Sequence, residues 1–431
     1  MKTIKKIIIV TFSMLLLVSC TSKTNSITAR KDYDKYLEIK DNKSRDFAQG
    51  EIDFWQNKYN KAPNQTSYLS LMASNYSKLF ENTAKVAYLY KAEKLLLQVN
   101  KEYKYGEVGP IRSLGRNYIS QHRFKEALVL ANKALAIGEG KIETQKLLFD
   151  VNMELGNYAE AEKNLTYLTD KNDFDYCIRI SKWNDHLGDL KTAISFMEKA
   201  KQIAIANDNK SLKIWTFSNL GDLNGHAGNI KTSYDYYLKT LAIEPNHSYA
   251  LKGIAWIAFS YERDSKEALR IIDDISKKHH TPDFYLLKAQ IAEYDNDVTL
   301  KNQNLKDYFT MLNTIGYGAM YNKYNTLIYA DTKATAAKAL EIAKVEIEHR
   351  PTPDSYDLLA WAYYNMGNAK KALEIEEKFV VGKSFEPKLN YHVATIYKAN
   401  NLNAKIAPLK EELLKSIYEL GPNMENKIKN L

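Results

Sequence analysis

The chain has 431 residues, 45% of them hydrophobic, whereas a single compact core rarely grows beyond about 250–300 residues. We therefore expect either several domains or an extended array of repeats. Its 61 basic and 52 acidic residues are interspersed, while a nucleic-acid-binding protein usually gathers its basic residues on one face. This composition argues against a nucleic-acid partner.

Residues 1–20 have the pattern of an export signal. Lys2, Lys5 and Lys6 precede an apolar run at 7–18, which is shorter than the roughly 20 apolar residues of a membrane-spanning helix. The run ends in the residues LVSC at 17–20, which resemble the lipobox of bacterial lipoproteins. The resemblance implies that a lipoprotein signal peptide is cleaved before Cys20 and that a lipid is attached to the Cys20 sulfur.

The residues after Cys20 bear on location and on the N-terminal region. No acidic residue follows Cys20 directly, which by the sorting rule of enteric bacteria implies a lipid-anchored protein of the outer membrane, facing the periplasm. Residues 21–30 are polar and unpatterned, and such a stretch reaches about 33 Å when extended, so we predict a flexible tether. Residues 31–107 have helical patterns without a clear repeat, and we predict atypical N-terminal capping helices there.

One short motif recurs along the rest of the chain. The hexapeptide GNAKKA at 367–372 resembles GNYAEA at 156–161, GDLKTA at 188–193 and GNIKTS at 228–233. Its last position recurs every 32 to 40 residues, apart from one double interval at a weaker unit, and the average period is about 34. The aligned residues are Ala127, Ala161, Ala193, Ser233, Ala268, Ala339, Ala372 and Ile406. A fixed period of this length is typical of a repeat solenoid.

Each unit is predicted to be a pair of helices. In 111–135, Leu114, Gly115 and Tyr118 share one helical face, and Ala127 begins a second stripe that continues at i+4 and i+7. In several units a Gly-Asn or Gly-Asp pair lies between the two helices, where Gly can take the left-handed conformation that ends a helix. The small aligned residue lets the two backbones approach closely.

These features together resemble the tetratricopeptide repeat. The resemblance rests on the L-G-x-x-Y pattern at 114–118, on Ala127, and on Leu359, Gly367 and Ala372 in a later unit. It implies an all-α fold, a right-handed α-solenoid of tetratricopeptide-like helical hairpins. About nine units would cover 108–420, and 421–431 would form a C-terminal tail.

Motifs for catalysis are missing from the sequence. It contains no G-x-x-x-x-G-K-[ST], no H-E-x-x-H and no C-x-x-C. Cys177 stands alone on a helical pattern and is expected to act as a small buried hydrophobe. We expect no enzymatic activity, no cofactor and no metal.

The family resemblance also implies a binding groove. In tetratricopeptide repeats, positions 2, 5, 9 and 12 of each first helix face the concave side. The candidate partner-binding residues are Arg112, Arg116, Lys146, Lys182, Tyr321, Tyr324, Trp361, Tyr364 and Tyr391. Aromatic and arginine side chains often anchor interfaces, but tyrosines at these positions are equally explained by packing between helices.

We therefore expect a membrane-anchored scaffold that binds an extended peptide or protein segment in its concave groove, because helix-lined grooves commonly take peptides. The alternative is a glycan- or nutrient-binding lipoprotein. Known proteins of that kind combine a lipobox with helical repeats and carry long inserted loops, whereas the units of this chain are close to standard length.

Overall fold

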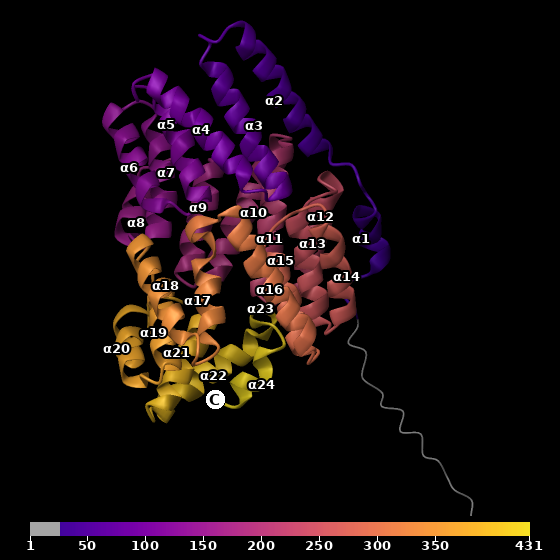
Figure 1. The fold of residues 1–431 in the computed structure, drawn as a ribbon, viewed down its shortest axis with the longest axis vertical. Helices are drawn as coiled ribbons and strands as arrows, with labels where there is room; N and C mark the ends of the chain where they lie inside the picture. Colours follow the sequence, from indigo (N-terminus) through magenta and orange to yellow (C-terminus); the bar gives the residue numbers. More distant parts are fainter. Residues whose placement is uncertain (1–25) are drawn as a thin grey trace, which may run out of the picture.

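The computed structural model describes residues 26–431, so Cys20 and the predicted signal peptide at 1–20 lie outside the described residues. Between Arg30 and Lys429 every regular element is helical (Figure 1). The helices form consecutive antiparallel pairs, each pair packed against the next. The prediction of an all-α solenoid of helical hairpins is confirmed.

The described residues contain ten hairpins. Their first helices are α3 (Ser67–Thr83), α5 (Val108–Ser120), α7 (Lys141–Leu155), α9 (Phe174–His186), α11 (Lys210–His226), α13 (Ser248–Trp256), α15 (Asp283–Tyr294), α17 (Asn322–Ala330), α19 (Pro353–Asn365) and α21 (Pro387–Ala399). Their second helices are α4 (Ala87–Glu102), α6 (Phe124–Ile137), α8 (Tyr158–Thr166), α10 (Leu190–Ala206), α12 (Ile230–Ile243), α14 (Ser265–Ser276), α16 (Val298–Ile315), α18 (Ala336–His349), α20 (Ala369–Phe379) and α22 (Ile406–Lys415).

The remaining elements lie at the two ends of the array or directly adjoin a helix of a hairpin. Two helices, α1 (Arg30–Leu37) and α2 (Lys43–Lys61), precede the first hairpin, and α23 (Ile417–Leu420) and α24 (Met424–Lys429) follow the last one. A π-helical segment η1 (Ile257–Tyr261) extends α13, and short 3-10 turns η2 (Gly318–Tyr321) and η3 (Asn403–Lys405) precede α17 and α22. None of the helices between Arg30 and Lys429 combines the length and the apolar character that a membrane crossing requires.

Where the recurring hexapeptide occurs, it forms the turn between the two helices of a hairpin. Gly367 has a φ of +89°, a left-handed conformation that other residues rarely adopt, and it ends α19. The Asn368 side chain then accepts a hydrogen bond from the Lys371 backbone N–H at the start of α20. The last residue of the hexapeptide, or the residue aligned with it, is buried between the helices. Seven of these residues are 0% exposed: Ala127, Ala161, Ala193, Ser233, Ala268, Ala339 and Ala372. A small side chain at this position lets the two helices of a hairpin approach.

The array coils back on itself, so that early and late hairpins are in contact. The pairs in contact are Thr83 with His280, Gly156 with Thr352, Gly188 with Phe385 and Gly225 with Tyr418, which are 193 to 197 residues apart. With a period of about 34 residues, one superhelical turn takes about six hairpins. Figure 1 shows the result: α17 to α20 lie below α5 to α8.

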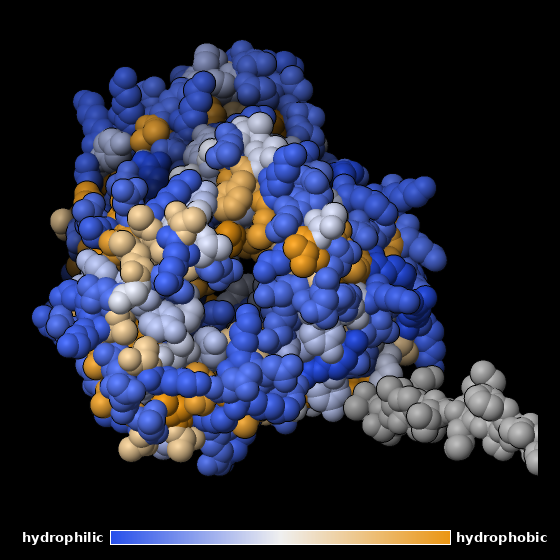
Figure 2. Space-filling view, turned by 60° about the horizontal axis from the view of Figure 1, so that its bottom comes forward, coloured by the Kyte–Doolittle hydropathy of each residue, from blue (hydrophilic) through white to orange (hydrophobic). Residues whose placement is uncertain are grey.

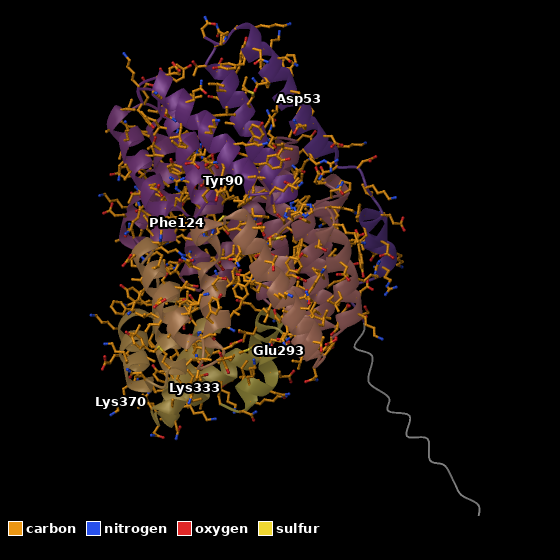
Figure 3. The ribbon with its side chains drawn as sticks, in the orientation of Figure 1. Asp53, Tyr90, Phe124, Glu293, Lys333 and Lys370 are labelled. Atoms are coloured by element: carbon orange, nitrogen blue, oxygen red, sulfur yellow. The ribbon has the colours of Figure 1, made fainter. Side chains whose placement is uncertain are left out.

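Side chains bridge the two turns. The Tyr90 hydroxyl in α4 donates a hydrogen bond to the Gly316 carbonyl at 2.6 Å. The Arg350 guanidinium lies 5.8 Å from the Phe124 ring centre and 3.7 Å from the Glu154 carboxylate. Figure 3 places Tyr90 and Phe124 between the upper and the lower hairpins. These contacts hold the array in a closed shape.

Both ends of the described chain depart from the sequence-based predictions. Residues 21–30 are predicted to be a flexible tether, but residues 26–29 are hydrogen-bonded to Glu262 and Tyr234 in the middle of the array. Residues 421–431 are predicted to be a tail, but this segment contains α24, whose Met424 and Ile428 are buried. In both cases the partners are distant in sequence, which no local pattern reveals.

Candidate binding cavity on the concave face

The concave side of the array contains a cavity of about 720 Å³. Its walls are the first helices α11, α13, α15, α17 and α21, with α23 and α24 on the opposite side. Figure 2, in which the bottom of the molecule comes forward, shows a hollow near the middle of this face. The superhelical turn brings these first helices around a common space, and α15 and α17 contribute the most side chains to it.

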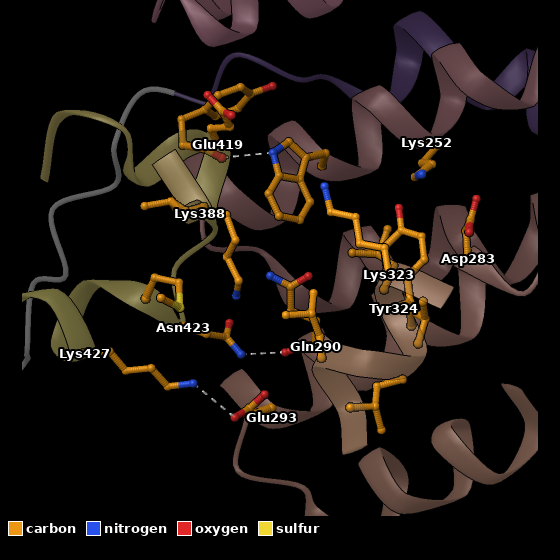
Figure 4. Close-up of a pocket in the computed structure, with 18 of the residues that line it drawn as sticks. Lys252, Asp283, Gln290, Glu293, Lys323, Tyr324, Lys388, Glu419, Asn423 and Lys427 are labelled. Carbon is orange, nitrogen blue, oxygen red and sulfur yellow. Dashed lines mark hydrogen bonds and ion pairs between the residues drawn. The ribbon is translucent and has the colours of Figure 1, made fainter. Parts of the chain in front are cut away.

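The C-terminal segment closes this cavity. The Trp256 indole N–H donates a hydrogen bond to the Tyr418 carbonyl at 3.0 Å, and the Ser260 hydroxyl donates to the same oxygen at 2.6 Å. The Asn423 amide N–H donates to the Gln290 carbonyl at 2.9 Å. These bonds join α13 and α15 to the C-terminal segment, and Figure 4 shows the one between Asn423 and Gln290.

Close backbone approach and charge pairs complete this closure. Gly421 has a φ of +85°, a backbone conformation in which a residue with a side chain is strained, and a Cβ atom there would lie 3.1 Å from the Trp256 ring. The Lys427 ammonium lies 3.7 Å from the Glu293 carboxylate (Figure 4). Glu425 lies 3.4 Å from the Arg263 guanidinium. The C-terminal segment thus lies across the concave face in this part of the array.

A carboxylate bridged by two tyrosines forms one wall of the cavity. The Tyr237 hydroxyl donates to Asp222 at 2.6 Å, and the Tyr249 hydroxyl donates to its other oxygen. Burial raises the pKa of Asp222, and the two hydroxyl donors act in the opposite direction. This side chain is held in place by its neighbours and has little freedom to meet a ligand.

Several other charged side chains in the cavity have no partner. Lys388, Asp331 and Glu419 line it and make no side-chain hydrogen bond or ion pair with any residue in 26–431. Burial lowers the pKa of Lys388, and burial raises the pKa of both Asp331 and Glu419. Figure 4 shows Lys388 reaching into the cavity. A ligand that carries both charges would pair with these groups.

The predicted aromatic residues fall into three different environments. Tyr324 lines the cavity and is 42% exposed. Tyr321 is only 8% exposed and packs edge-on against other tyrosines, so it is a packing residue. Trp361, Tyr364 and Tyr391 lie close together on α19 and α21, with the Trp361 and Tyr364 ring centres 5.1 Å apart, outside the cavity lining.

Three of the four predicted basic residues are engaged with neighbouring helices. The Lys146 ammonium lies 2.9 Å from Glu143 and 2.7 Å from Asp175, and Lys182 lies 2.9 Å from Glu154. Arg112 donates to the Gly140 carbonyl at 3.3 Å.

The fourth basic residue differs from the others. Arg116 is exposed on α5, and within 26–431 it has no carboxylate within ion-pair distance. Lys182 also borders a smaller cavity of about 350 Å³ between α9 and α11. The basic residues therefore lie apart from the central cavity.

The sequence-based candidate set missed most of the cavity. Of the nine predicted groove residues only Tyr324 lines it, while Lys388, Asp331 and Glu419 were not among them. Lys388 occupies position 2 of α21, so the positional rule places it on the concave side, although it is not in the candidate set. Among residues 26–431, no cluster of His, Cys, Asp or Glu side chains is arranged to hold a metal ion.

Comparisons with known proteins bear on the fold. No family model matches the chain, and no curated protein matches it. Among solved structures it is similar to PilF of Pseudomonas aeruginosa (17% identity, 49% of this chain and 92% of that chain, TM-score 0.36). It is also similar to a tetratricopeptide repeat protein from Parabacteroides merdae (17% identity, 56% of this chain and 94% of that chain, TM-score 0.40). A third similar structure is human IFIT1 with m7Gppp-AAAA (12% identity, 76% of this chain and 75% of that chain, TM-score 0.49).

The class of protein follows from the structure's own geometry. The period near 34 residues, the stacked antiparallel pairs and the buried small residue near the start of seven of the second helices give this chain the fold of an α-solenoid of tetratricopeptide-like helical hairpins.

Proposed function

We propose that this chain is a membrane-tethered binding protein that holds a short charged segment of a partner protein in the central cavity. The observation that carries the proposal is the set of unpaired charges of both signs at Lys388, Asp331 and Glu419. Lys388 and Glu419 are half-buried and have no partner, which is unfavourable for a charge, and a bound segment of complementary charge would offset that cost.

The shape of the cavity limits what can bind. The C-terminal segment covers the concave face between α11 and α15, so a long extended peptide cannot run along it. A short stretch, or a loop that enters from the rim near Tyr324, fits a space of about 720 Å³. The partly exposed aromatic ring of Tyr324 supplies apolar contact area beside the charges.

The membrane tether is part of the same proposal. The residues LVSC at 17–20 support a lipid on Cys20. Retention in the outer membrane with the body in the periplasm follows the sorting rule used above. Replacing Cys20 with alanine is expected to release the protein from the membrane fraction of cells that express it.

Photo-crosslinking in cells tests the binding site. With p-benzoylphenylalanine in place of Tyr324, we expect capture of one partner protein, identified by mass spectrometry. Lys388→Met should reduce this capture about tenfold or more, because a ligand carboxylate would lose its buried counter-charge. The fold should persist, since removing an unpaired ammonium does not weaken packing.

Two controls make this experiment decisive. The first places the same photoreactive group at Val129, which is 67% exposed on α6 and distant from the cavity. The second is Lys344→Met, a change of the same kind at an exposed lysine on α18. Equal capture from positions 324 and 129, or equal loss with both lysine variants, would refute the proposed site.

A second candidate function is binding of a small nutrient molecule. The cavity volume favours it, because sites for small ligands measure about 300–1,000 Å³. Native mass spectrometry of protein purified from its membrane distinguishes the two. A bound small molecule that is lost with Lys388→Met supports this alternative, and its absence together with a crosslinked protein supports the partner segment.

A further inference from the structure

The first described residues are held by a single carboxylate. The backbone N–H groups of Ile27 and Thr28 donate to one oxygen of Glu262 at 2.6 and 2.7 Å. The Thr28 hydroxyl donates to the other oxygen at 2.7 Å, and the Ser26 hydroxyl lies 3.0 Å from the first oxygen. A carboxylate that accepts several N–H and O–H donors makes strong, charge-assisted hydrogen bonds.

The attachment continues into α1, which packs against α12 and α14. The Ala29 backbone N–H donates to the Tyr234 hydroxyl at 3.1 Å. The buried Tyr33 hydroxyl donates to Glu267 at 2.7 Å, and Arg30 forms an ion pair with the same carboxylate at 2.5 Å. Thr28 is only 8% exposed and Tyr33 only 1%. The chain is therefore fixed to the array from Ile27 onward.

This attachment sets how far the array can lie from the anchor. Six residue steps separate Cys20 from Ser26, and a chain of that length spans at most about 20 Å. A tether of residues 21–30 would instead reach about 33 Å and leave the body free to rotate. The fixed point is Glu262, directly after η1, so this part of the array is the part nearest to the anchor.

We propose that Glu262 is a clamp which keeps the turn between η1 and α14 within about 20 Å of the lipid anchor and so sets which edge of the array faces the membrane. The inference rests on the proposed lipid anchor at Cys20. The neighbours of Glu262 connect the clamp to the cavity, because Ser260 and Arg263 hold the C-terminal segment. The C-terminal wall of the cavity thus lies on the membrane side, and the bilayer surface is the partner of this edge.

Hydrogen exchange tests the clamp without any membrane. In the wild-type protein, the amides of Ile27 and Thr28 should exchange slowly, and Glu262→Ala should speed their exchange by tenfold or more. Glu162→Ala, at an exposed carboxylate on α8, is the matched control and should change nothing there. Fast exchange in the wild type, or no effect of Glu262→Ala, would overturn the clamp whatever the state of Cys20.

Energy transfer on vesicles tests the orientation. The lipidated protein is placed on vesicles of phosphatidylethanolamine and phosphatidylglycerol that contain an acceptor dye on their headgroups. A donor dye is attached through Lys266→Cys on α14 or through Lys370→Cys on α20, which Figure 3 places at the opposite edge. The native Cys177 is 0% exposed and will not react.

The expected result is at least twofold greater transfer from position 266 than from position 370. Glu262→Ala should abolish this difference, and Glu162→Ala should preserve it. Equal transfer from both positions in the wild type would overturn the fixed orientation. Release of the wild-type protein from the vesicles would instead refute the lipid anchor, so the failures of the two proposals are distinguishable.

Discussion

Replacing Gly221 with alanine will destabilise the protein by about 2 kcal/mol, because the Tyr237 ring fills the space that the new methyl group needs. A Cβ atom on Gly221 would lie 2.4 Å from the Tyr237 ring. The ring cannot move away, since a Cβ atom on Gly253 would lie 2.4 Å from its other side. Its hydroxyl is also held by Asp222 at 2.6 Å. This glycine–tyrosine–glycine contact joins α11 to α13 at the cavity wall.

Urea denaturation measures the effect as a lower unfolding midpoint. Tyr237→Leu should partly relieve the clash, so Gly221→Ala should be much less harmful in the double variant than in the wild type. Gly50→Ala in α2 is the control: a Cβ atom there meets nothing within 4 Å, and we expect a slight gain in stability. An unchanged midpoint for Gly221→Ala, or strictly additive effects with Tyr237→Leu, would contradict the packing described.

Glu376→Gln is expected to stabilise the protein at neutral and alkaline pH. Glu376 is 0% exposed in α20, and neither of its carboxyl oxygens has a hydrogen-bond donor among residues 26–431. It lies beside Asp357, which is 2% exposed and bonded to His392 Nδ1 at 2.9 Å. Burial first, and then the Asp357 charge, raise the pKa of Glu376 well above its usual value. The protonated acid can donate its O–H to Asp357.

The sign of the pH effect follows from this raised pKa. The unfolded chain releases the Glu376 proton near pH 4.5, whereas the folded protein retains it to a much higher pH. Stability from this group is therefore fully present below pH 4.5 and falls as pH rises, by about 1.4 kcal/mol per pH unit between the two pKa values. Glutamine copies the shape of the protonated acid but does not titrate, so it removes this loss.

Thermal unfolding from pH 5 to pH 9 measures the difference between the two proteins. We expect the Tm of Glu376→Gln to exceed that of the wild type by a margin that grows with pH. Titrating groups that do not contact Glu376 are common to both proteins and cancel in the difference. Glu374→Gln, at an exposed carboxylate of the same helix, should shift Tm little and equally at all pH values. A constant margin for Glu376→Gln would contradict the raised pKa.

The hairpins could be predicted from the sequence because their determinants are local. The turn glycine, the capping Asn or Asp and the small buried residue lie within six positions of one another. Gly367 and Ala372 fulfil these roles as predicted. The 40-residue interval between Ala193 and Ser233 also has a local explanation, since α10 and α11 are each 17 residues long.

The cavity could not be predicted, because it depends on contacts across a whole superhelical turn. Local patterns give no measure of the small rotation between successive hairpins, which decides that Gly225 meets Tyr418. The positional rule failed at Tyr321 for a local reason. The 3-10 turn η2 precedes α17, so Tyr321 lies in that turn and packs against Tyr308 and Tyr317.

Lys146 and Lys182 show a second limit of predicting groove residues from their positions in the repeat. Both lie on first helices as predicted, but their partners Asp175 and Glu154 come from the neighbouring first helix. A positional rule finds the charge and not its neutralising partner. The Glu262 contact was equally hidden, since 234 residues separate it from Thr28.

Carbodiimide cross-linking of the native protein tests the closure of the concave face most directly, because it joins amines only to carboxylates in direct contact. We predict a link between Lys427 and Glu293, which lie 3.7 Å apart and belong to distant parts of the chain. The link between Lys182 and Glu154, 2.9 Å apart on neighbouring first helices, serves as the internal standard. If the standard forms and Lys427 joins only residues of its own C-terminal segment, the concave face is open and the cavity does not exist.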